Sequence, residues 1–212
     1  MGLKPAGTIW TVGKDFVYEN AELGVRFEID GRFAPGPRLE APGGLPGDVR
    51  TAWLAARGAA GQAVLSISSV QVGYELSPQE LAEQLVIHNR YAALTAEQRG
   101  WTIHRPWEPT TVGGHLAMRN DYVAPGSTLA GGNDGGHDGD EDGDGGRDGR
   151  HEELAEAVAQ RDSTPGHVQG YVVYVGERTF QIMLGVDPPG DLAANRRVME
   201  RAMGTVEFTE PA

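Results

Sequence analysis

The aspartate-rich stretch at residues 131–153 has the side chains that most directly suggest chemistry. Within it, Asp138-Gly-Asp-Glu-Asp-Gly143 matches the opening of an EF-hand loop, where alternating aspartates supply calcium ligands. Position 12 of such a loop needs a bidentate glutamate, and the chain has Gly149 there. A segment so polar and rich in glycine buries too little apolar surface to offset its conformational entropy. We therefore expect a disordered acidic insert at about residues 126–166; weak condensation of cations and a specific calcium site are the alternatives.

Histidines are the next candidates for metal binding or proton transfer. His104 and His115 fall on neighbouring predicted strands, and together with the acidic insert they would suit a metal- or small-molecule-binding protein. Partly exposed strand histidines are the simpler interpretation. His88 lies on the apolar side of a predicted helix, as a buried structural histidine does. His151 precedes two glutamates but lacks the second histidine of a zinc-protease helix.

Nucleophiles and cofactor motifs are missing from the sequence. The chain has no cysteine, which excludes disulfides, thiolate metal sites and a cysteine nucleophile. Ser66, Ser68 and Ser69 lie within a predicted strand, without the Gly-x-Ser-x-Gly turn of a hydrolase. The glycine pair Gly113-Gly114 is too short to cradle a phosphate. We therefore expect no enzymatic activity, no catalytic residue, no metal ligand and no cofactor.

Charge and hydropathy restrict the partners. The net charge is −12, and residues 131–153 account for −7 of it. No basic cluster suggests nucleic-acid binding. No run of about 18 apolar residues predicts a membrane span, and the first residues lack the apolar core of a signal peptide. We expect a cytoplasmic protein.

A strand followed by a long helix is the strongest structural signal. Residues 63–72 are apolar and β-branched, and they follow another predicted strand at 49–57. Ser77-Pro-Gln-Glu80 then forms a capping box with proline at the first helical position. The helix is predicted over about 77–99, with Leu81, Leu85 and Tyr91 on its apolar side.

The remaining pattern indicates one domain over residues 15–212, interrupted by the acidic insert and preceded by a flexible arm over residues 1–14. Val25, Phe27 and Ile29 alternate with polar residues, as in a half-buried antiparallel strand. A second helix is predicted over about 191–203. The predicted fold class is α+β: an antiparallel β-sheet with both helices packed on one face.

Several local phrases resemble the Mog1/PsbP-like superfamily, which includes DcrB-like proteins and the Eag-type chaperones of type VI secretion effectors. They are Tyr18-Glu-Asn-Ala-Glu-Leu-Gly-Val-Arg-Phe-Glu-Ile29, Leu76-Ser-Pro-Gln-Glu-Leu81, Thr111-Val-Gly-Gly-His-Leu-Ala117 and Val206-Glu-Phe208. The similarity covers about residues 16–125 and 167–208. It implies an antiparallel sheet with helices on one face, and a binding role without chemistry.

A hairpin over residues 168–184 is apolar on both faces, so it is either covered on both sides or keeps one face for a partner. We predict a chaperone or adaptor that holds an apolar client segment on its sheet face, and the resemblance implies a secretion effector as the client; a homodimer would close the same face. The predicted partner-binding residues are Trp53, Tyr171, Val173, Phe180 and Ile182. Trp53, Trp101, Trp107 and Tyr122 form either an aromatic binding surface or part of the core.

Overall fold

The computed structural model describes residues 7–12, 15–35, 50–58, 61–124, 166–187 and 192–210. Its elements, in chain order, are β1 (Thr8–Val12), β2 (Asp15–Asn20), β3 (Val25–Ile29), β4 (Phe33–Pro35), β5 (Arg50–Gly58), β6 (Gly61–Gln71), α1 (Pro78–Arg99), β7 (Thr102–Val112), β8 (His115–Ala124), β9 (Gly166–Val175), β10 (Arg178–Asp187), α3 (Leu192–Thr205) and β11 (Glu207–Phe208).

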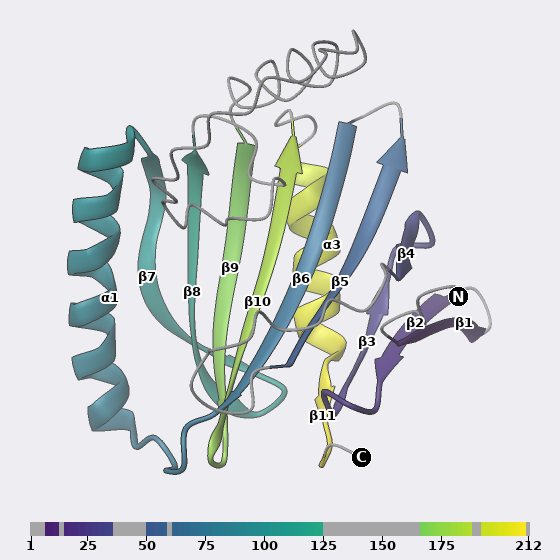
Figure 1. Cartoon of the computed structure of the whole chain (residues 1–212), viewed down its shortest axis with the longest axis horizontal. Coiled ribbons are helices and arrows are strands. Elements are labelled where there is room, and N and C mark those ends of the chain that lie inside the picture. The colour runs from purple at the N-terminus through teal and green to yellow at the C-terminus, as the bar shows by residue number, and fades with distance from the viewer. Residues whose placement is uncertain are drawn as a thin grey trace, which may run out of the picture.

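A seven-stranded antiparallel sheet forms the body of the molecule, with strand order β4-β5-β6-β10-β9-β8-β7 (Figure 1). The predicted hairpin, β9 and β10, lies near its middle. Gly176 has φ of +55° at the first central position of the hairpin turn, as a type II′ turn requires. β10 pairs with β6 on its other side, so that Ile182 lies opposite Ile67. The hairpin is therefore flanked by strands along both of its long sides.

α1 begins and ends as the sequence predicts. The Ser77 hydroxyl accepts a hydrogen bond from the Glu80 N–H, and the Glu80 carboxylate accepts one from the Ser77 N–H, which closes the capping box. Gly100 ends the helix with φ of +69°, a left-handed conformation that glycine adopts without strain. Capping at both ends allows α1 to form although Leu81 is the only buried side chain among its 22 residues.

A second sheet has strand order β1-β2-β3-β11. β1 pairs with β2, with Thr8 opposite Glu19 and Val12 opposite Asp15. The prediction of a flexible arm is therefore wrong for residues 8–12, because this β-branched and aromatic run extends a sheet edge. The last strand, β11, returns the C-terminal part of the chain to β3.

The core lies between the large sheet on one side and α3 with the second sheet on the other. Its largest fully buried side chains are Tyr18, Leu23, Phe27, Ile29, Leu54, Leu65, Ile67, Phe180, Ile182, Leu184 and Met199. Over residues 51–56 of β5, 63–70 of β6 and 180–184 of β10, buried residues alternate with part-exposed or exposed ones. The large sheet therefore has one core face and one face turned away from α3.

The predicted α+β class, with antiparallel pairing, a long helix and a C-terminal helix, is confirmed. The helices differ from the expectation in that they do not share a face. Asp121 of β8 bonds to α3, whereas its neighbour Asn120 lies with α1 residues around one pocket. Adjacent strand residues point to opposite faces, so α3 covers the core face and α1 lies along the β7 edge on the other side (Figure 1). In the part of the chain that the structure describes, no helix is long and apolar enough to cross a bilayer.

Candidate binding face

The face of the large sheet turned away from α3, called the open face below, is part-exposed on β5, β6 and β10. Its residues on these strands are Thr51, Trp53, Ala55, Val64, Ser66, Ser68, Val70, Thr179, Gln181 and Met183. On β8 and β9 the middle of the same face is closed, because Met118 and Val172 are buried. Solvent therefore reaches the open face mainly over β5, β6 and β10.

One row of paired residues crosses the open face from β5 to β8. Trp53 lies opposite Ser66, and Ser66 lies opposite Met183. Met183 lies opposite Gly170, which in turn lies opposite Asn120. Bulky and small side chains therefore alternate along the row, which gives this face an uneven surface with room beside each large side chain.

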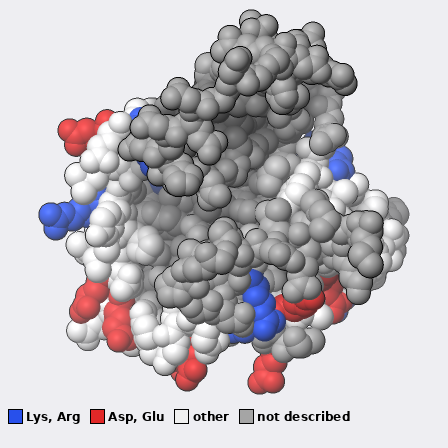
Figure 2. All heavy atoms as spheres, in the orientation of Figure 1, with Lys and Arg blue, Asp and Glu red and all other residues white. Residues whose placement is uncertain are grey.

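α1 forms a wall at one side of the open face. Ile87, Tyr91 and Leu94 have exposed fractions of 45%, 65% and 44%, and their i, i+4, i+7 spacing puts them on one side of the helix. Tyr91 lies beside Met183 of the sheet around a shared pocket, so the apolar side of α1 meets the open face at Tyr91. The outer side is charged instead: Figure 2 shows acidic and basic side chains along the margin that α1 occupies in Figure 1. The exposed apolar side of α1 and the open face are thus continuous.

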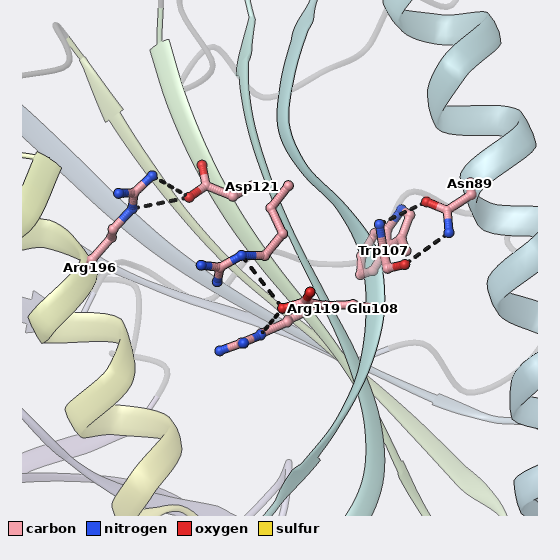
Figure 3. Close-up of polar contacts among 7 residues, drawn as sticks. Asn89, Trp107, Glu108, Arg119, Asp121 and Arg196 are labelled. Atoms are coloured by element: carbon pink, nitrogen blue, oxygen red, sulfur yellow. Dashed lines mark hydrogen bonds and ion pairs between the residues drawn. The ribbon is translucent and has the colours of Figure 1, made fainter.

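A single asparagine ties α1 to the edge of the sheet (Figure 3). Trp107 lies within a register shift between Arg105 and Glu108, on the edge strand β7. The Asn89 Nδ2 donates to the Trp107 carbonyl at 2.9 Å, and the Trp107 N–H donates to Asn89 Oδ1 at 2.8 Å. The carboxamide of Asn89 therefore pairs with the Trp107 backbone as a neighbouring strand would, and the edge is covered.

We expect Asn89→Ala to loosen α1 without unfolding the sheet. Two hydrogen bonds, worth about 0.5–1.5 kcal/mol each, are lost from a helix that buries one side chain. Hydrogen exchange of α1 amides should accelerate by about tenfold or more, while β10 amides stay as protected as before. Gln98→Ala changes an exposed residue of the same helix and is the control. It should leave the exchange rates of the α1 and β10 amides unchanged. Equal acceleration in α1 and β10 would contradict this anchoring role.

A pocket of about 170 Å³ lies where α1 meets the open face. Its walls are His88, Tyr91, Ala92, Thr95, Trp101, Ile103, Arg105, Pro106, Trp107, Asn120, Tyr122, Gln181 and Met183. Trp101 stacks on Tyr122 with ring centroids 4.7 Å apart, and Trp107 meets the edge of His88 at 5.5 Å. Three of the four aromatic residues singled out in the sequence therefore line one pocket, and Trp53 lies farther along the same face.

Burial keeps two titratable groups of this pocket, His88 and Tyr122, neutral. Desolvation lowers the pKa of His88 below its ordinary 6.5 and raises the pKa of Tyr122 to about 12. Both side chains are therefore uncharged at neutral pH. Arg105 is the charged member of the lining, and it pairs with Glu108 at 3.5 Å. The pocket consequently favours an uncharged occupant.

Four of the five predicted partner-binding residues lie in the core. Tyr171, Val173, Phe180 and Ile182 are at most 4% exposed and face α3 and the second sheet. The prediction that these four contact a partner is wrong, because the hairpin turns this face inward. Trp53 lies on the open face and is half-buried, with an indole N–H that has no hydrogen-bond partner.

The predicted histidine pair does not form. Ile103, beside His104, lies opposite Tyr122, whereas His115 lies opposite Val112 at the other end of β8. At about 3.3 Å per residue the two histidines are roughly 20 Å apart, too far to share a ligand. No metal-binding group of three or more His, Asp or Glu side chains occurs among the described residues. The acidic insert and its calcium-like stretch lie outside them.

A buried polar cluster joins the core face to α3 (Figure 3). Asp121 is 1% exposed; it bonds to His167 Nε2 and accepts two hydrogen bonds from Arg196, at 3.1 and 2.7 Å. Burial alone would raise the pKa of Asp121, but the hydrogen bonds and charges of His167 and Arg196 outweigh it, and the pKa lies below 3.8. A His–Asp pair can serve as a general base, but His167 is only 2% exposed and is therefore shielded from solvent. The cluster is structural.

Sequence reasoning missed Asn89 and Asn120, and it placed Tyr91 on the apolar side of its helix, where the structure leaves Tyr91 65% exposed. Asn120 is 8% exposed, and its Oδ1 has no hydrogen-bond partner. A carbon added at Gly170 would lie 2.5 Å from this oxygen, so only glycine leaves the carboxamide its place. No local signal marks these residues, because each acts through a segment far away in the chain.

Comparisons with known proteins do not identify a family. No family model and no curated protein matches the chain. A crystal structure of a protein of unknown function, PA94 from Pseudomonas aeruginosa, aligns over 97% of this chain and 99% of that one, with 14% identity and a TM-score of 0.45. A structure from Bacteroides thetaiotaomicron aligns over 88% of this chain and 45% of that one, with 9% identity and a TM-score of 0.40. Similarities this low give no argument about function.

Proposed function

We propose that the protein is a non-enzymatic binding module, a cytoplasmic chaperone or adaptor that holds an apolar segment of a client protein on its open face. The observation that supports this is the exposed apolar side of α1, Ile87, Tyr91 and Leu94, beside a part-exposed sheet face. Contiguous large apolar side chains at the surface are typical of interaction sites. Membership of the Mog1/PsbP-like superfamily, with a secretion effector as client, is part of the proposal.

The client segment that fits best is an amphipathic or apolar helix. Ile87, Tyr91 and Leu94 repeat at the spacing by which one helix packs against another. The described open-face positions of β5, β6 and β10 named above carry no charge; their side chains are hydroxyl, amide and apolar. Ser66 and Ser68 are small enough to let a helix approach the sheet between Trp53 and Met183.

The test is binding of a purified client to variants that place a charge on this surface. A client is captured from the native host, identified and purified, and its dissociation constant is measured by calorimetry. Ile87→Glu and Tyr91→Glu should each weaken binding by about tenfold or more, equivalent to about 1.4 kcal/mol, because a carboxylate would be buried against the client.

Val86→Glu is the matched control. Val86 is 70% exposed on the same helix, one residue from Ile87, and points away from the pocket side. A carboxylate at position 86 should change the dissociation constant of the client by less than about twofold. Equal weakening by all three variants would contradict the proposed surface. If the isolated protein dimerises and Ile87→Glu makes it monomeric, the occupant is a second copy and the client proposal is wrong.

A further inference from the structure

We infer that the 170 Å³ pocket between α1 and the open face is a site for a small, uncharged, planar ring that carries a hydrogen-bond donor. The inference goes beyond the proposed function, because it concerns a free small molecule and holds whether or not a client binds. It rests on the volume of the pocket, on its lining residues and on the unpaired Oδ1 of Asn120.

The size of the pocket sets the size of the ligand. An engineered cavity of about 150 Å³ in another protein holds one benzene molecule. A pocket of about 170 Å³ therefore suits a single ring with one or two small substituents. A fused cofactor such as a flavin or a nucleotide is too large.

The lining sets the shape and charge of the ligand. Trp101 and Tyr122 stack almost in parallel, with 6° between their planes, and Trp107 stands against His88. Aromatic rings arranged in this way favour offset or edge contacts with another ring. Because burial keeps His88 and Tyr122 neutral, the described lining residues offer an ionised ligand no counter-charge apart from the paired Arg105.

Asn120 supplies the polar preference. Its side chain is among the pocket-lining residues, and its buried Oδ1 accepts no hydrogen bond. Buried acceptors are usually satisfied, and leaving one unpaired costs about 1–3 kcal/mol. Rotation of the carboxamide about its Cβ–Cγ bond would offer this oxygen to a ligand O–H or N–H. A ring with such a donor is therefore favoured over an isosteric hydrocarbon.

The experiment uses phenol and toluene, which are close in size and differ in the donor. Each is titrated into the protein while the four indole N–H signals are followed by NMR. Saturable shifts are expected for Trp101 and Trp107, which line the pocket, and not for Trp10 and Trp53, which lie outside it. In Asn120→Leu, the ratio of phenol to toluene affinity should fall by about tenfold, while toluene still binds.

A second variant covers the case in which Asn120→Leu fails to fold. Ala92→Leu adds bulk from α1 into the pocket and should weaken the binding of both phenol and toluene by tenfold or more. Val86→Leu, on the outer side of the same helix, should change neither affinity. Shifts that do not saturate, or that affect all four indoles equally, would overturn the site. An unchanged phenol-to-toluene ratio in folded Asn120→Leu would overturn the role of the donor.

Discussion

Replacing Phe180 with alanine is expected to lower the free energy of unfolding by about 3–5 kcal/mol, a large share of the roughly 5–15 kcal/mol that stabilises a typical domain. Phe180 is 1% exposed and packs on Phe208 with ring centroids 4.8 Å apart. Its neighbours across the sheet are Val173 and Ser69, whose backbones cannot move in to fill the space. Urea denaturation of the purified variant measures the loss.

Gln181→Ala is the control for this prediction. Gln181 is the next residue of β10, and it is exposed on the open face. Its truncation should change the free energy of unfolding by no more than about 0.5 kcal/mol. If the two variants lose similar stability, the core does not lie on the face that packs against α3. The comparison also separates loss of folding from loss of client binding, since Phe180 does not contact the open face.

Local signals in the sequence were sufficient for most elements. The capping box of Ser77 and Glu80 and the helix end at Gly100 depend on residues within one turn, so α1 was predicted nearly to its ends. The turn at Gly176 likewise fixes the hairpin. In each case the residues that decide the structure are close together in the chain.

Which face of the hairpin is buried could not be decided in the same way. β9 and β10 are apolar on both faces, so their own alternation favours neither. The information lies in β6, where Leu65 and Ile67 alternate with Ser66 and Ser68. That alternation applies to β10 only once the pairing of Ile182 with Ile67 is known. A contact between segments so far apart has no local signature, and four predicted partner residues were therefore assigned to the wrong face.

The orientation of α1 beside the pocket could not be predicted from the sequence either. Tyr91 shares the apolar side of α1 in the sequence, which indicates burial when a helix packs face-on against a sheet. α1 instead lies along the β7 edge, held by Asn89, and this leaves Tyr91 at 65% exposure beside the open face. The register shift that frees the Trp107 backbone for Asn89 is a tertiary feature of the β7–β8 pair. Periodicity alone therefore predicted the helix and not its orientation.

Asp121→Ala is expected to cost about 3 kcal/mol, at the lower end of the range for breaking a buried charge pair, because the Arg196 side chain is 39% exposed and can be solvated. The change removes the acceptor of both Arg196 and His167, and His167 is 2% exposed. Glu207→Ala is the control: its ion pair with Arg26 spans 3.7 Å at the surface, and its loss should cost less than about 1 kcal/mol.

The stability that Asp121 contributes should depend on pH in a defined direction. Its pKa in the folded protein lies below the ordinary 3.8, so the unfolded chain takes up its proton first as the pH falls. The contribution is therefore complete above about pH 5 and is lost as the pH drops through the folded pKa. Urea denaturation of Asp121→Asn and the parent protein between about pH 6 and pH 2.5 measures this. The difference between them should shrink toward the acid end, and a difference that stays constant or grows would show that the Asp121 carboxylate is not held ionised by His167 and Arg196.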